Sequence, residues 1–157
     1  MIQRIQTLYL FLATVLTVAC MSICIGAFVS EQGEVIGKLY NLLYFTMEEG
    51  EKTASSFTPW ALFAILLISA TLSFMNIFLF KYRALQMRVC TFCMILLVGW
   101  YIAYGAFAWF IMGLLQAASF RVGAVASFPC VSLILLYLAF RGILKDEKLV
   151  RSLDRLR

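Results

Sequence analysis

The chain has 157 residues, of which 64% are hydrophobic and 13% are charged, and its formal net charge is +5. Soluble domains carry about 25% charged residues, so this composition excludes an ordinary soluble domain. The basic residues flank apolar runs and do not form a single patch, which argues against a nucleic-acid partner.

Long apolar runs without an internal charged residue dominate the chain. About 20 helical residues cross the apolar core of a bilayer, so each run is long enough for a membrane-spanning helix. We therefore expect one all-α domain, residues 1–157, folded as a four-transmembrane-helix bundle. The predicted spans are Ile5–Val29, Pro59–Phe80, Val89–Leu115 and Val122–Phe140.

The first run follows a basic start, so a cleaved signal peptide is an alternative to a membrane helix. Its apolar stretch exceeds the core of about 7–15 residues that signal peptides have. We therefore expect a retained helix, with Gln3, Arg4 and Gln6 at the membrane surface.

The segment Ser30–Phe57 is the largest predicted loop. Within it, Glu34–Met47 mixes β-branched and aromatic residues, which favours a short β-hairpin. An amphipathic helix over Lys38–Met47 is the alternative. Thr58 before Pro59 is typical of a helix start with a capping hydroxyl.

The rest of the chain predicts short connections and a helical tail. Residues Lys81–Arg88 form a connector and Gln116–Phe120 a tight turn. Pro129 inside the fourth run predicts a kink. The tail Arg141–Arg157 has apolar residues at roughly helical spacing, so we expect an amphipathic helix that continues the fourth span or bends away from it.

Charge distribution predicts the topology. Ten Lys and Arg residues lie near the two termini or in the connector, whereas only three lie in the other loops. The loop 30–57 holds five Glu. The positive-inside rule therefore predicts cytoplasmic termini and an external loop. The cytoplasmic cations also predict contact with anionic lipid headgroups.

Five cysteines raise the possibility of redox chemistry. Cys90 and Cys93 form a CxxC pair, which is similar in outline to membrane oxidoreductases that make disulfides with quinone. The predicted topology places this pair on the reducing cytoplasmic side, and the external loop has no cysteine. We expect Cys90, Cys93, Cys20 and Cys24 to pack as small apolar residues.

The spans lack the groups that metal sites and ion pumps need. The chain has no His, and no carboxylate lies within a span. Zinc sites and proton pathways require such ligands or ionisable groups. We therefore expect no catalytic, cofactor-binding or metal-binding residues, while an uncharged pore or a lipid-handling groove stays an alternative.

Small residues four positions apart predict close helix packing in lipid. Packing against another helix of the bundle is favoured, although a second membrane protein could use the same surface. The residues are Gly99, Ala103, Gly123 and Ser127.

Polar residues gather at the predicted cytoplasmic face. Asn76 lies inside a span, where an unpaired amide is costly, so we expect it to hydrogen-bond to a neighbouring helix or connector. Interface anchoring and internal hydrogen bonding are favoured for the whole set over a ligand site. The candidate residues are Gln3, Arg4, Gln6, Asn76, Lys81, Arg83, Gln86, Arg88, Arg151, Asp154 and Arg155.

Three stretches resemble a known family. They are MIQRIQTLYL at the start, NIFLFKYRALQMRVC over Asn76–Cys90, and KDEKLVRSLDRLR over Lys145–Arg157. They are similar to small four-span inner-membrane proteins of the Bacteroidota, the family catalogued as domain of unknown function 4293. The resemblance implies a multi-pass protein of the bacterial inner membrane and implies no activity.

We therefore expect a non-enzymatic accessory or scaffold subunit of a larger membrane complex, with other inner-membrane proteins as partners. A small transporter, channel or lipid-binding protein is the alternative. A membrane thiol oxidoreductase is a minor alternative.

Overall fold

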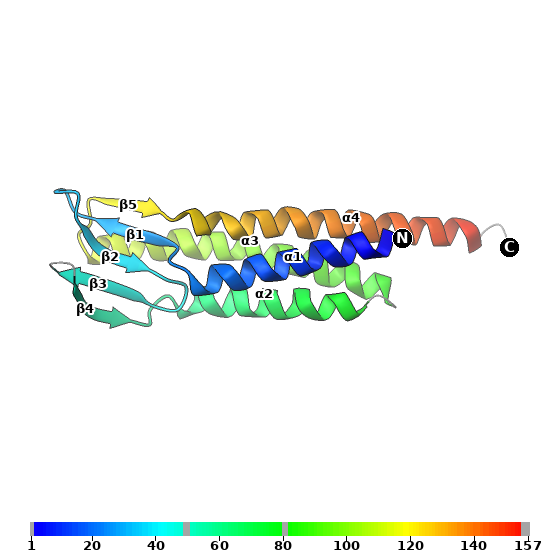
Figure 1. The fold of residues 1–157 in the computed structure, drawn as a ribbon, viewed down its shortest axis with the longest axis horizontal. Helices are drawn as coiled ribbons and strands as arrows, with labels where there is room; N and C mark the ends of the chain where they lie inside the picture. The colour runs from blue at the N-terminus through cyan, green and yellow to red at the C-terminus, as the bar shows by residue number, and fades with distance from the viewer. Residues whose placement is uncertain (1, 49–50, 80–81, 155–157) are drawn as a thin grey trace.

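The computed structural model describes residues 2–48, 51–79 and 82–154, and the side chains of 5–47, 55–79 and 82–148 within them. These residues form four long helices that lie side by side, with a small sheet at one end of the bundle (Figure 1). We call this end the sheet end. The opposite end, where the first helix begins and the fourth finishes, is the terminal end. The helices are α1 (Ile2–Ser22), α2 (Trp60–Phe78), α3 (Arg83–Leu114) and α4 (Phe128–Asp154).

All four helices are long and apolar enough to cross a membrane, with spanning segments of 18, 19, 32 and 25 residues. A helix of about 20 residues is about 30 Å long, which matches the hydrocarbon core of a bilayer. Helix α1 packs against α2 and α4, and α3 packs against the same two helices on the other side. The bundle is therefore a ring of four neighbours with a shared interior.

The sheet has five antiparallel strands in the order β4-β3-β2-β1-β5. Strand β1 pairs on one edge with β2 and on the other with β5, where Gly26 lies opposite Val122. The chain thus joins the end of the first helix to the connection between the third and fourth helices. The strands are β1 (Gly26–Val29), β2 (Val35–Leu39), β3 (Tyr44–Glu48), β4 (Glu51–Ser56) and β5 (Ser119–Val122).

Two predicted spans are shorter at the sheet end than expected. Helix α1 ends at Ser22, because the last residues of the first apolar run form β1. The fourth span was expected to start at Val122, which instead belongs to β5, and a short 3-10 helix η2 (Ala124–Ser127) precedes α4. Composition misled the prediction here, since a strand paired on both edges is as apolar as a membrane helix.

The predicted loop 30–57 contains strands, so the amphipathic helix over Lys38–Met47 is wrong. The hairpin prediction is correct but incomplete, because β2, β3 and β4 form a three-stranded meander. Gly33 adopts φ +87° in the β1–β2 turn, a conformation that suits glycine. Thr58 does not cap α2; its hydroxyl lies 2.9 Å from the Ser56 hydroxyl.

Three further expectations concern helix ends. Helix α3 starts at Arg83, so most of the predicted connector is helical. Pro129 is the second residue of α4 and lies in its first turn, where a missing N–H costs no helix bond, so it does not interrupt the span as expected. The tail continues α4 as one helix to Asp154 and does not bend away.

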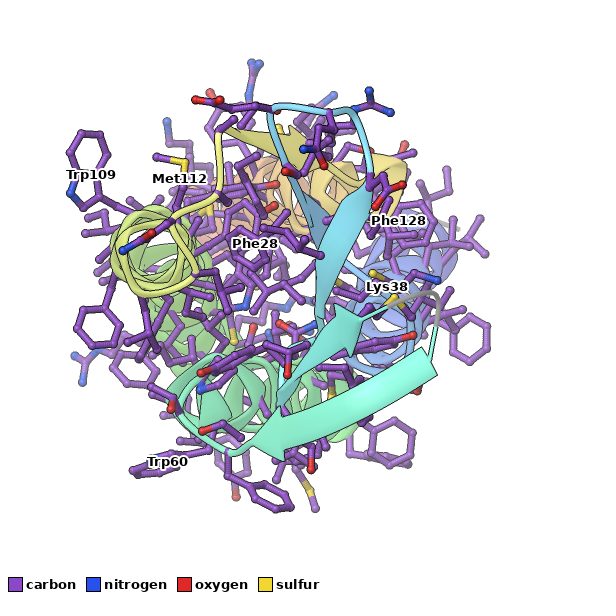
Figure 2. The ribbon with its side chains drawn as sticks, turned by 90° about the vertical axis from the view of Figure 1, so that its left-hand side faces the viewer. Phe28, Lys38, Trp60, Trp109, Met112 and Phe128 are labelled. Atoms are coloured by element: carbon purple, nitrogen blue, oxygen red, sulfur yellow. The ribbon has the colours of Figure 1, made fainter. Side chains whose placement is uncertain are left out.

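One hydrophobic core runs from the sheet into the bundle. Phe28 of β1 lies at the centre of the view from the sheet end and packs on Phe120 with ring centroids 4.9 Å apart (Figure 2). Trp60 and Trp109 point outward in the same view, 62% and 77% exposed. Aromatic side chains at this level are typical of a membrane–water interface.

Candidate functional site

At the terminal end, α2 and α3 are joined by two hydrogen bonds, in which the side-chain amides of Asn76 and Gln86 each donate to the other residue's backbone oxygen. Asn76 Nδ2 donates to the backbone oxygen of Gln86 at 3.3 Å, and Gln86 Nε2 donates to the backbone oxygen of Asn76 at 3.2 Å. Asn76 Nδ2 also lies 3.0 Å from Cys90 Sγ. Asn76 is 1% exposed and Gln86 6% exposed. The expected hydrogen bonding of Asn76 is therefore confirmed.

A second contact joins α1, α4 and α3. Gln6 Nε2 donates to Asp146 Oδ2 at 2.8 Å, and an Arg83 guanidinium N–H donates to the backbone oxygen of Asp146 at 3.3 Å. Gln6 reaches Asp146 across Gly142, where a Cβ would lie 2.9 Å from Gln6 Cγ. The terminal end is therefore held by side chains from all four helices.

The other predicted residues of this face fall into three groups. Arg88 is exposed on the first turns of α3. The backbones of Gln3, Arg4, Arg151 and Asp154 are helical, but their side chains lie outside the described ones. Lys81 and Arg155 lie outside the described residues.

A buried polar cluster at the sheet end was not predicted. Asn41, 0% exposed, donates from Nδ2 to the backbone oxygen of Cys20 at 2.6 Å and accepts from Trp100 Nε1 at 3.0 Å. Its own backbone oxygen accepts from the Phe63 N–H at 3.2 Å. One asparagine therefore links the end of α1, the first turn of α2 and the middle of α3. Trp100 carried the available signal, because a tryptophan N–H inside a span needs an acceptor.

Two tyrosines extend this cluster. Tyr104 Oη donates to the backbone oxygen of Ile25 at 2.8 Å, and its ring stacks on Trp100 with centroids 5.1 Å apart. Tyr101 Oη donates to the backbone oxygen of Ala126 at 2.7 Å. These aromatic donors satisfy carbonyl groups where the chain leaves one element for the next. The cluster therefore has a structural role.

The four predicted packing residues behave differently from one another. A Cβ at Gly123 would lie 2.9 Å from the backbone carbon and oxygen of Ile25, so glycine permits a close chain approach there. Ala103 packs partly buried against the core. Ser127 is exposed, and its hydroxyl donates to the backbone oxygen of Ala124 at 2.6 Å. Gly99 lies beside open space, since a Cβ there would meet no described atom within 4 Å apart from its own helix backbone and chain neighbours.

Gly99 belongs to an outward face of α3 that the bundle leaves uncovered. A Cβ at Gly113 would also meet no atom within 4 Å outside its own helix backbone, and Ile102 is 71% exposed. Gly99, Ala106 and Gly113 recur every seven residues, which places them on one helix face. We call these three residues the α3 small-residue face.

All five cysteines are free thiols. Cys90 and Cys93 are both 0% exposed, and Cys93 Sγ lies 3.9 Å from the backbone oxygen of Ser69. Within the described residues no group of three or more His, Cys, Asp or Glu side chains is arranged to hold a metal ion.

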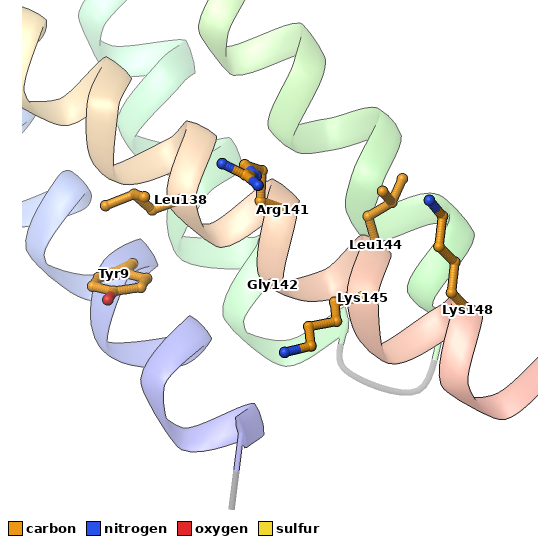
Figure 3. A pocket seen from close by; sticks show the side chains of 7 residues that line it. All are labelled: Tyr9, Leu138, Arg141, Gly142, Leu144, Lys145 and Lys148. Carbon is orange, nitrogen blue, oxygen red and sulfur yellow. The ribbon is translucent and has the colours of Figure 1, made fainter.

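A groove of about 480 Å³ lies between α1 and α4 near the terminal end. Tyr9 lies on its α1 side, and α4 supplies the other lining residues (Figure 3). Three of these are cationic and three are apolar or glycine. The lining residues on α4 are Leu138, Arg141, Gly142, Leu144, Lys145 and Lys148.

The four long apolar helices of the described residues define a multi-pass membrane protein. Buried polar side chains join these helices near both ends of the bundle. The chain belongs to the family described as Domain of unknown function (DUF4293), whose model matches residues 2–156. No curated protein matches the chain.

Proposed function

We propose that this protein is a non-enzymatic accessory or scaffold subunit of a larger assembly in the bacterial inner membrane. The α3 small-residue face is the observation that supports this proposal most directly. Small side chains let helix backbones approach closely in lipid, where packing and not the hydrophobic effect drives association. Among the described residues, no other part of the chain packs closely against Gly99 or Gly113.

In this proposal the terminal end faces the cytoplasm and the sheet lies outside. The charge distribution supports it, since ten of the thirteen Lys and Arg residues lie, in the sequence, near the two termini or between the second and third spans. Trp60 and Trp109 are exposed toward the sheet end, and in the proposed orientation they would lie at the outer headgroups.

A lipid-binding role is the second candidate, and the groove between α1 and α4 is the observation that favours it. The groove lies at one end of the bundle. A transport pathway would have to continue between the helices, where the interior is filled by large side chains such as Trp100, Leu97 and Leu136. The oxidoreductase alternative gains no support from Cys90 and Cys93, because neither sulfur is accessible.

Native co-purification in a mild detergent tests the proposal. We expect further membrane proteins to purify with the chain. In an Ala106→Leu, Gly113→Leu variant they should be lost while the protein itself still folds, since these positions face open space. Recovery of the unchanged protein as a lone monomer in several mild detergents would contradict the proposal.

Gly105→Leu is the matched control. Gly105 is also open and lies on the same helix, but it is rotated by about 100° from Ala106. We expect this variant to keep its partners. Equal loss in both variants would mean that bulk anywhere on α3 disturbs the assembly and that the small-residue face has no special role.

A further inference from the structure

The groove between α1 and α4 has an ordered polarity along its length. Leu138, Arg141, Lys145 and Lys148 follow one another on one face of α4, at steps of three or four residues. Leu138 lies toward the middle of the bundle, and the three cations lie toward the terminal end (Figure 3). From Leu138 to Lys148 the rise is about 15 Å, which is about half the thickness of the hydrocarbon core of a bilayer.

The sides of the groove fit the same gradient. Tyr9 presents a half-buried aromatic ring from α1, and Leu144 adds a second apolar surface. Gly142 keeps the floor shallow, because it is where α1 comes close to α4 through Gln6. The lining of the groove is therefore apolar toward the middle of the bundle and positively charged toward the terminal end.

Neither Asp146 nor Glu147 of α4 belongs to the lining of the groove. Asp146 accepts from Gln6 Nε2 at 2.8 Å, and its backbone oxygen accepts from Arg83. None of the residues lining the groove is acidic. Three of the seven lining residues are therefore cationic and none is acidic, so the lining carries net positive charge.

We propose that this groove binds one acidic phospholipid, with its phosphate at Arg141, Lys145 and Lys148 and an acyl chain along Leu138 and Tyr9. Basic pockets between membrane helices are suited to acidic headgroups. Charged residues at one end of the groove and apolar residues at the other favour a lipid over a free phosphate ion. A lipid can contact both parts, whereas a phosphate ion has no acyl chain to contact the apolar residues. This inference is independent of the α3 small-residue face.

Native mass spectrometry of the full chain, with phosphatidylglycerol titrated into a neutral detergent, tests the proposal. We expect one tightly held phosphatidylglycerol and phosphatidylcholine binding weaker by about tenfold. An Arg141→Gln, Lys145→Gln, Lys148→Gln variant should lose this preference. Equal binding of the two lipids, or displacement of phosphatidylglycerol by excess inorganic phosphate, would overturn the proposal.

Two matched variants separate site from bulk charge. Lys38→Gln, Arg88→Gln, Arg121→Gln removes the same number of charges outside the groove and should keep the preference. Lys145→Arg, Lys148→Arg keeps the groove charge and should also keep it. If the control set lost binding as strongly as the groove set, net charge alone would account for the affinity.

Chemical labelling of lysines in the unmodified protein tests the same site without depending on whether a variant folds. Phosphatidylglycerol should protect Lys145 and Lys148 from an amine-reactive reagent, with Lys38 of β2 as the internal reference. Equal labelling of the three lysines with and without phosphatidylglycerol would contradict the proposed site.

Discussion

The helices are joined by buried hydrogen bonds at both ends of the bundle, but different side chains make these bonds at each end. At the sheet end, Trp100, Tyr104 and Asn41 donate to one another or to backbone oxygens where helices give way to strands. At the terminal end, the Gln6 amide joins α1 to α4, and the Gln86 amide joins α3 to α2. Large aromatic side chains fill the sheet end, whereas long polar side chains hydrogen-bond between helices at the terminal end, near exposed cations. Both arrangements hold helices together, and Arg141, Lys145 and Lys148 are exposed near the second.

This comparison predicts that stability is concentrated at the sheet end. Asn41→Ala should have the largest effect, because it leaves the Cys20 carbonyl and the Trp100 N–H buried without partners. Each such group costs about 1–3 kcal/mol, so we expect a loss of about 3 kcal/mol. Unfolding in mixed detergent and sodium dodecyl sulfate measures it. Leu42→Ala, at the exposed neighbour, is the control and should change little.

A pair of glycine substitutions sharpens the comparison. Gly123→Ala should cost about 1–3 kcal/mol, because its Cβ would press on the backbone of Ile25. Gly142→Ala at the terminal end should cost less, about 1 kcal/mol or under, because the Gln6 side chain can move away. The same unfolding assay compares them. Equal costs would contradict the predicted difference in stability between the two ends.

The terminal-end contact between α1 and α4 should be weaker than any sheet-end contact. Gln6→Met keeps the side-chain volume and removes the amide that donates to Asp146. Polar contacts between membrane helices average about 0.6 kcal/mol, so we expect a loss of that size. A loss above that of Asn41→Ala would reverse the order of the two ends.

Sequence reasoning recovered the helices because their signal is local. An apolar run reports its own environment, and Asn76 inside such a run had to find a partner nearby. Strand β1 could not be recovered in this way. Its pairing of Gly26 with Val122 joins residues 96 positions apart, and its composition equals that of a helix.

The sheet-end cluster was hidden for a related reason. The sequence around Asn41 predicts a loop. The structural role of Asn41 depends on hydrogen bonds with Cys20 and Trp100, which lie far away in the sequence and come close only in the fold. Gly99 and Gly123 show the limit of spacing as a signal. Both belong to small-residue pairs, yet Gly123 meets the backbone of Ile25 and Gly99 meets open space.

The central claim is that the two ends have different roles because they face different sides of the membrane, and impermeant thiol labelling in intact cells tests it most directly. Glu31→Cys in the β1–β2 turn and Lys145→Cys on α4 report on the two ends, in a Cys24→Ser, Cys130→Ser background that removes the thiols that are not buried. We predict that Glu31→Cys is labelled in intact cells and Lys145→Cys only after permeabilisation. Labelling of Lys145→Cys from outside, with Glu31→Cys protected, would contradict the account.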